Sequence, residues 1–186
     1  MDRRGTWFAL ARGMANPLEQ FSAKAMGTVK AVKAGFNGLR GVFLHLAEEH
    51  GEVGALMKAV SKSHDAQFRR EHYPKIRIEL LSHERAELAT VFPMLSHYDA
   101  TRELVVLHNQ EASQLEAAIA AVDALDASTP AWGDAFEHLF ALVQQHVQEE
   151  EDSFFPKAQE MIGEEEAKAL LPRFEAAKKA AKYQVQ

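Results

Sequence analysis

The stretch of residues 80–94, LLSHERAELATVFPM, decides how the fold is interpreted. On a helix that advances ~100° per residue, its apolar face also carries a histidine and two glutamates. The residues on this face are Leu80, His83, Glu84, Glu87, Val91 and Met94. His83 and Glu87 are four residues apart, so both side chains can reach one site. Because a buried carboxylate is costly without a compensating charge, the stretch predicts a buried site that holds a cation.

Three other segments combine an apolar stripe with a histidine in the same way. The periodicity predicts helices over 39–63, 73–96, 100–125 and 130–154. Each stripe contains one histidine, and the fourth helix repeats the spacing of a glutamate four residues after its histidine. The polar residues on the four stripes are His50, His83 with Glu87, His108, and His146 with Glu150. No lysine or arginine lies at the centre of a stripe, so we expect a metal ion to supply the compensating charge.

The distances along the chain place these side chains at one level, because residues equally far from a shared turn lie side by side in antiparallel helices. His50 and His83 lie about 17 and 16 residues from a turn centred near residue 67. His108 and His146 lie about 20 and 18 residues from a turn centred near residue 128. At ~1.5 Å per residue, these offsets agree to within about one helical turn. The histidines and glutamates of all four helices are therefore expected to converge.

The number and type of these ligands indicate two metal ions. Four imidazoles and two carboxylates exceed the protein ligands of one catalytic zinc, which number about three. They suit two ions bridged by Glu87 and Glu150. Nitrogen and oxygen ligands without sulfur favour iron or manganese, with zinc as an alternative.

The predicted fold class is all-α, an antiparallel up-down-up-down four-helix bundle with extra N- and C-terminal helices. We expect residues 1–38 to form a basic amphipathic helical extension, and residues 39–186 to form the bundle with a last helix over 164–183. The extension has an apolar stripe, for which we favour docking onto the bundle over a membrane surface or a partner's groove. The stripe consists of Phe21, Ala25, Val29, Val32 and Phe36.

Composition excludes several classes of protein. The 186 residues include no cysteine, which rules out disulfides, thiolate metal sites, iron–sulfur clusters and cysteine nucleophiles. Residues 1–40 have seven basic and two acidic side chains, whereas the remainder has 14 basic and 25 acidic ones, so the main body is a poor partner for nucleic acid. No apolar run approaches the ~18 residues of a membrane span. Arg12 interrupts a short apolar stretch near the start, so we reject an export signal and expect a cytoplasmic protein.

The ordered set of four segments resembles the hemerythrin family, in its bacterial HHE cation-binding branch, over about residues 42–158. The resemblance rests on His50 within EEHGEV, His83-x-x-x-Glu87 followed by Phe92-Pro93, His108, and His146-x-x-x-Glu150 followed by Phe154-Phe155-Pro156. It implies an oxo- or hydroxo-bridged non-heme di-iron centre, bridged by the two glutamates and capped by the histidines. It also implies binding or sensing of O2 or a related small ligand, while other members handle iron.

The sequence departs from the oxygen-carrying members of that family at two positions. Ala112 stands where those members have a second histidine on the third helix, and Glu151 stands where they have an aspartate, although Glu150 fits the stripe better. Glu84 is the favoured substitute for the missing ligand, and Glu111 is the weaker one. We expect such a carboxylate-rich site, with an extra open position, to favour oxidised iron.

The resulting functional hypothesis is a di-iron protein that binds or senses O2. The alternative is a di-iron enzyme or iron-handling protein that reduces peroxide, oxidises a small substrate, or stores and donates iron. We favour binding over catalysis because no further acid–base or substrate motif stands out near the site. The redox or protein partner is not evident from the sequence. The remaining histidines near turns or off the stripes, His45, His64, His72 and His97, are expected to be surface residues.

Overall fold

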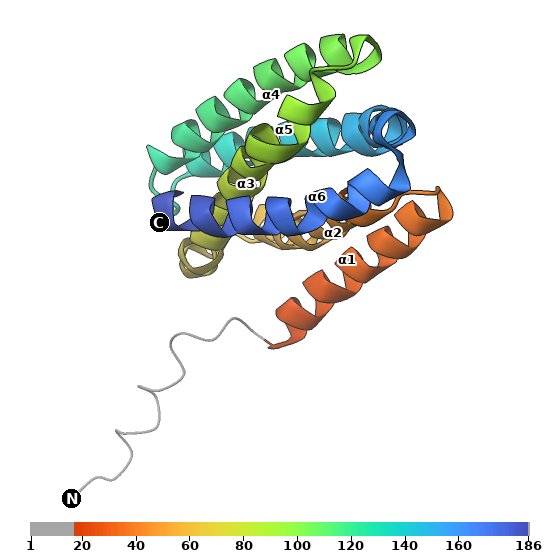
Figure 1. Cartoon of the computed structure of the whole chain (residues 1–186). Coiled ribbons are helices and arrows are strands. Elements are labelled where there is room, and N and C mark those ends of the chain that lie inside the picture. The colour runs from red at the N-terminus through yellow and green to blue at the C-terminus, as the bar shows by residue number, and fades with distance from the viewer. Residues whose placement is uncertain (1–16, 186) are drawn as a thin grey trace, which may run out of the picture.

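The protein is described by a computed structural model, in which residues 17–185 can be described, and their regular structure is entirely helical (Figure 1). The helices are α1 (Pro17–Phe36), α2 (Gly41–Lys62), α3 (Ala66–Leu95), α4 (Asp99–Asp123), α5 (Pro130–Glu149), a π-helix η1 (Glu150–Phe154) and α6 (Phe155–Val185). The predicted all-α class is confirmed. None of the helices within residues 17–185 is long and apolar enough to span a membrane.

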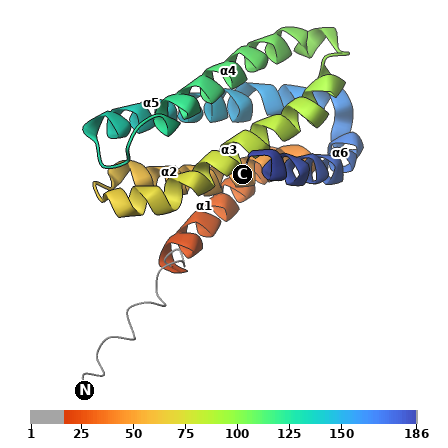
Figure 2. The ribbon, with the colours of Figure 1, turned by 90° about the vertical axis from the view of Figure 1, so that its left-hand side faces the viewer.

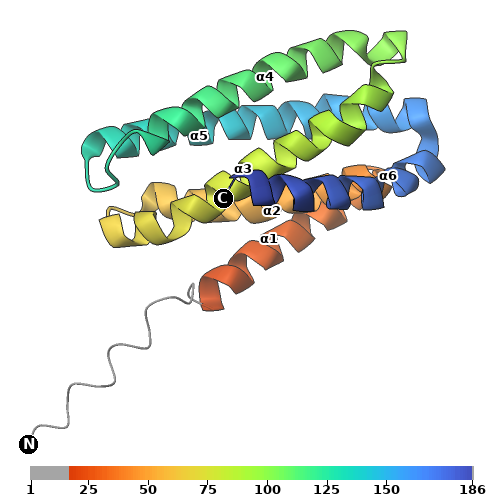
Figure 3. The ribbon, with the colours of Figure 1, turned by 60° about the vertical axis from the view of Figure 1, so that its left-hand side comes forward.

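The helices are arranged around the pair α2 and α3. Figures 2 and 3 show α4 and α5 together on one side of this pair and α1 on the other side. Helix α6 packs on α3 and α2. The short connections between successive helices turn the chain back on itself (Figure 3). Each of the central helices therefore has an inward face and an outward face.

Helix α3 begins earlier than the predicted start at Tyr73-Pro74, and Pro74 lies inside it. Asp65 caps the helix by accepting a hydrogen bond from the Gln67 backbone N–H at 2.8 Å. Arg69 is buried in the second turn, donates to the Ser63 and Ala127 carbonyls, and lies over the Trp132 ring. These tertiary contacts stabilise the turns before Pro74, although the proline removes one helical hydrogen bond.

The last two predicted helices are joined by irregular turns. The helix predicted over 130–154 becomes a π-helix from Glu150, and α6 already begins at Phe155 rather than at residue 164. The predicted start near 164 coincides with a kink, because Gly163 has φ 79° and ψ 168°. Glycine adopts such a conformation without the steric penalty of a side chain. The kink sends the rest of α6 back along α2 and α3 (Figure 1).

Two apolar clusters form the core and leave a polar layer between them. One contains Phe43, Leu46, Phe92, Phe155 and Phe174 among others, and the second contains Met57, Ile76, Ile119, Phe136 and Leu139. On α2 and α4, the predicted metal-binding histidine lies between the segments that supply these two clusters, and on α3 the predicted metal-binding residues lie where the second cluster gives way to the first. The core thus encloses the polar residues from both ends.

Helix α1 packs on α2 through small residues, and Ala25 and Val29, the two stripe residues whose side chains are described, are exposed. Gly27 lies against Gly51, and a Cβ added at Gly51 would come within 2.8 Å of the Gly27 Cα. Ala34 is also buried, whereas Val29 of the stripe is 61% exposed. Side chains of the other stripe residues Phe21, Val32 and Phe36, and all of residues 1–16, lie outside the described part of the structure.

One expectation about the other histidines is wrong. His72 is buried, stacks on the Phe68 ring at a centroid distance of 4.0 Å, and bonds through Nδ1 to the Phe68 carbonyl. It belongs to the second turn of the extended α3, which the sequence interpretation placed before the helix began. His64 and His97 are exposed, and His45 is partly buried.

Candidate metal centre

The structure brings all seven predicted metal-binding residues together in two adjoining groups. The first group consists of His50, His83 and Glu150, and the second of Glu84, Glu87, His108 and His146. In each group, one donor atom of every residue lies within 4.8 Å of the donor atoms of the others. All these residues are buried except His83, which is partly buried. Helix α3 contributes to both groups because His83, Glu84 and Glu87 lie on its inward face.

The first group is held by α2, α3 and the π-helix. Nε2 of His50 lies 3.2 Å from Nε2 of His83 and 3.2 Å from Oε2 of Glu150. Nε2 of His83 lies 3.5 Å from Oε2 of Glu87. Nitrogen and oxygen donors from three separate elements therefore point at one small volume.

The second group is held by α3, α4 and α5. Nε2 of His108 lies 2.8 Å from Oε1 of Glu84, and Nε2 of His146 lies 3.4 Å from Oε2 of the same carboxylate. Glu84, which the sequence interpretation offered as a substitute ligand, thus faces both imidazoles. Glu111 lies outside the group, where its Oε2 contacts the outer nitrogen of His146 at 3.1 Å.

Glu87 and Glu150 stand between the two groups. One oxygen of Glu150 faces His50, while the other lies 3.4 Å from His108 and 3.6 Å from His146. Oε2 of Glu87 lies 3.5 Å from His83 and 4.0 Å from His108. Each carboxylate therefore faces imidazoles of both groups, as a bridging ligand must.

Three further carboxylates, here called the outer carboxylates, orient the imidazoles. Glu151 accepts from Nδ1 of His50 at 3.0 Å, Glu49 accepts from Nδ1 of His83 at 2.8 Å, and Glu111 accepts from Nδ1 of His146 at 3.1 Å. An ionised carboxylate can only accept, so Nδ1 of each of these imidazoles carries a proton and Nε2 is the nitrogen that faces inward. Metal-binding histidines are generally held in this way.

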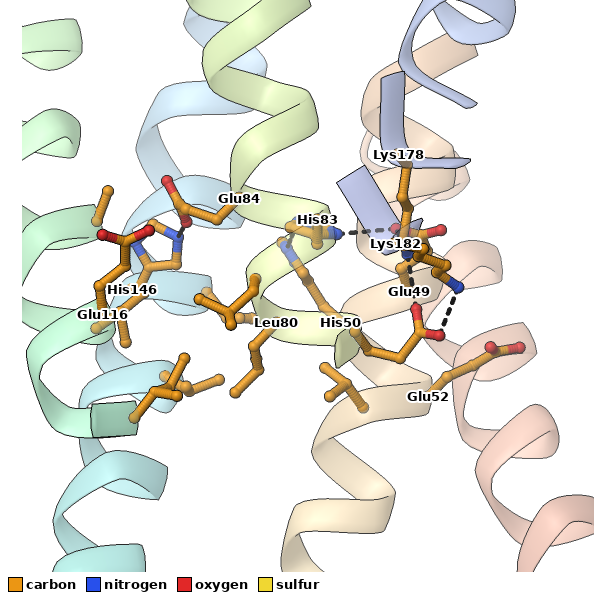
Figure 4. A pocket seen from close by; sticks show the side chains of 18 of the residues that line it. Glu49, His50, Glu52, Leu80, His83, Glu84, Glu116, His146, Lys178 and Lys182 are labelled. Atoms are coloured by element: carbon orange, nitrogen blue, oxygen red, sulfur yellow. Dashed lines mark hydrogen bonds and ion pairs between the residues drawn. The ribbon is translucent and has the colours of Figure 1, made fainter. Parts of the chain in front are cut away.

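Two of the outer carboxylates are in turn paired with lysines from the flanking helices. Lys30 of α1 lies 2.7 Å from Glu151, and Lys178 of α6 lies 2.7 Å from Glu49. Figure 4 shows Lys178 and Lys182 gathered next to Glu49 and His83. Sequence reasoning missed Glu49, because a glutamate beside His50 gives no sign that it faces another helix.

The electrostatics show that the site attracts positive charge. Burial and the neighbouring Glu150 and Glu84 raise the pKa of Glu87 well above its usual value. Burial acts against ionisation of Glu84, but the adjacent imidazoles of His108 and His146 outweigh it and lower the pKa of Glu84 to about 2. Burial likewise disfavours protonated His146, yet the neighbouring carboxylates of Glu150, Glu111 and Glu84 raise its pKa to about 12.

The donor set passes a direct test of fit to metal ions. Both oxygens of Glu87, both oxygens of Glu150 and Nε2 of His146 are buried without a hydrogen-bond partner. Buried polar atoms are normally satisfied, and leaving one unsatisfied costs about 1–3 kcal/mol. Cations between the two groups would satisfy these atoms and compensate the buried carboxylates, and the absence of sulfur fits iron or manganese.

Comparison with known proteins agrees with this chemistry. The family model described as the hemerythrin HHE cation binding domain matches residues 41–158. A protein named DNA nickase from Nostoc sp. is 24% identical over 130 residues, which cover 70% of this chain and 37% of that protein. The chain thus spans little more than a third of that relative. No solved structure matches the chain.

Proposed function

Because the chain belongs to the hemerythrin HHE cation-binding domain family, we propose that it holds two iron ions and binds or senses O2. In this proposal, α2, α3, α4 and α5 form an antiparallel up-down-up-down bundle, and the ions lie between these four helices. The single observation that carries the proposal is the set of seven convergent donors, among which the buried oxygens of Glu87 and Glu150 have no hydrogen-bond partner. Iron bound there would supply redox chemistry and a coordination position for a small ligand.

In this proposal, the residues of the chain have distinct tasks. Glu87 and Glu150, which face both groups of donors, would hold the ions together with the imidazoles and Glu84. Glu49, Glu111 and Glu151 hold the imidazole rings with their Nε2 lone pairs inward. The apolar clusters at both ends exclude water from the donors, which strengthens their interaction with a cation.

The side of the site at Ala112 supports an open position for a small ligand. Ala112 lies one helical turn after His108 and contributes no donor atom. It lines a pocket that also reaches His50, His83, Glu84 and His146. A ligand could therefore approach the centre from this side without displacing a side chain.

The pocket also favours the second candidate function, a di-iron enzyme or an iron-handling protein, because a catalytic site needs access for a substrate. The nicking activity in the name of the Nostoc relative is not part of the proposal, since most of that protein lies outside the match.

Metal analysis of the purified protein tests the proposal. We expect about two irons per chain after anaerobic reconstitution, and loss of iron in His83→Ala and in Glu87→Ala. His97→Ala, at an exposed position, serves as the matched control and should keep its iron. Full iron content in either site variant would contradict the assignment. An absorption band that forms with O2 and reverses under vacuum would support binding, whereas rapid irreversible oxidation would favour the enzyme.

A further inference from the structure

A pocket of about 440 Å³ adjoins the metal-binding residues and is larger than the proposed function requires. Helices α2 to α6 all contribute to its walls. Pockets for small organic molecules have volumes of ~300–1,000 Å³. A ligand of only two atoms, such as O2, would fill a small part of this space. The volume therefore requires an explanation of its own.

The body of the pocket is apolar and leads directly to the metal-binding residues. Figure 4 shows Leu80 at its centre, between His146 and Glu84 on one side and His50 and His83 on the other. The apolar lining comes mainly from α3, α4 and α5, with Val53 from α2, and includes Leu80, Ala112, Leu115, Ile119, Val143 and Val147. Such a surface favours an apolar molecule, because the hydrophobic effect rewards its removal from water.

The charges around the pocket disfavour an anionic ligand. The lining contains six glutamates and three lysines. Two of the lysines are already paired: Lys178 lies 2.7 Å from Glu49 and 3.0 Å from Glu79, and Lys182 also pairs with Glu79. Apart from any bound iron, the acidic excess of the walls would repel a carboxylate or phosphate, and the paired lysines are not free to bind one.

We propose that this pocket binds a compact, uncharged, largely apolar organic molecule next to the metal centre. The polar group of that molecule faces the inner end of the pocket, where the metal-binding residues lie. The proposal goes beyond the binding of O2. The apolar contacts that carry it come from residues that hold no metal.

Titration with indole, followed by ligand-detected NMR, tests the proposal on the full chain. Indole is neutral and aromatic, and it carries one polar N–H; indole-3-carboxylate is its anionic counterpart. We expect indole to bind with a dissociation constant in the millimolar range or tighter, and the carboxylate to bind at least about tenfold more weakly. Leu80→Trp places an indole ring in the pocket itself, and we expect it to weaken indole binding by at least about tenfold.

Leu125→Trp is the matched control, because Leu125 is 38% exposed and does not line the pocket. It should bind indole within about twofold of the unmodified protein. Ala112→Phe provides a second way to fill the pocket, and circular dichroism identifies which of the two filled variants is folded. The proposal is overturned if the unmodified protein fails to bind indole, if a folded filled variant binds it normally, or if the carboxylate binds as well as indole.

Metal content is measured on the same samples, so the two proposals can fail separately. Indole binding that is lost only in the filled variants, in protein that takes up no iron, would support the pocket and contradict the di-iron centre. Two irons per chain without indole binding would support the di-iron centre and contradict the pocket proposal.

Discussion

Glu49→Gln tests whether the outer carboxylates contribute to metal binding. The substitution keeps the shape of the side chain and an oxygen that can accept from Nδ1 of His83 at the present 2.8 Å. It removes the negative charge that makes the imidazole a better donor to a cation. It also removes one of the two carboxylates that pair with the buried Lys178, leaving Glu79 at 3.0 Å.

The expected magnitude follows from the position of Glu49 behind a single ligand. Loss of an outer partner of a metal-binding histidine weakens metal affinity by ~10–100-fold, which corresponds to about 1.4–2.8 kcal/mol. The effect should fall on the ion next to His83, because Glu49 is bonded to no other imidazole of the centre. The position of Glu49 beside His83 alone predicts that, in Glu49→Gln, a chelator removes the iron next to His83 before the other iron.

Anaerobic competition with a chelator measures this change. Glu48→Gln, one residue earlier and also partly buried, is the matched control for the loss of one charge on α2. Lys178→Met removes the contact of Glu49 with Lys178 and leaves its hydrogen bond to His83 in place. We expect it to change iron affinity less than Glu49→Gln. Equal affinity in Glu49→Gln and the unmodified protein would refute the role of the outer carboxylates.

Three other changes test the fold and its link to the metal. Removing the metal with a chelator should lower the melting temperature by ~5–10 °C, because a ligand at about 100 times its dissociation constant stabilises the folded state by ~2.7 kcal/mol. Calorimetric scans should show this decrease and its reversal when iron is added back, and an unchanged melting temperature would contradict the prediction. Phe136→Ala should cost ~3–5 kcal/mol of unfolding free energy in a denaturant titration, since Phe136 is 1% exposed and stacks on Trp132, and a loss below about 1 kcal/mol would show that the cluster is loosely packed. Gly27→Leu should release α1 from α2, because a Cβ there would lie 2.9 Å from the Glu48 carbonyl oxygen. The rate of backbone hydrogen exchange should rise in α1 while the iron content stays the same. An unchanged exchange rate would argue against the close packing of the two helices.

The convergence of the candidate metal-binding residues could be predicted because it follows from their spacing along the sequence. A histidine or glutamate on an otherwise apolar stripe stands out from its helical period alone, and the equal distances from the turns align the four stripes. The same reasoning did not identify the extra turns at the start of α3. Those turns depend on Arg69 reaching the Ser63 and Ala127 carbonyls, and on its contact with Trp132, about sixty residues later. A contact of that kind leaves no periodic signal.

The outer carboxylates and the pocket show the same limit. Glu49 and Glu151 look like parts of ordinary charged runs, EEH and QEEED, and only the packing of α2 against α3 and η1 aims them at imidazoles. The pocket could not be predicted from the sequence, because each apolar residue in its lining follows the same helical periodicity as a residue of the packed core. Whether such residues meet or leave a space depends on side-chain volumes across several helices.

The π-helix explains why the sequence offered both Glu150 and Glu151 as the metal-binding carboxylate of this segment. The helical stripe favours Glu150, whereas the resemblance to oxygen carriers places the carboxylate at Glu151. Because a π-turn inserts one extra residue, it widens the inward face, and consecutive glutamates can both face it. They meet His50 on opposite edges of its ring: Glu150 lies 3.2 Å from Nε2 and Glu151 lies 3.0 Å from Nδ1. One histidine therefore uses both residues, with Glu150 among the inward donors and Glu151 holding the ring from behind, where it also meets Lys30 of α1.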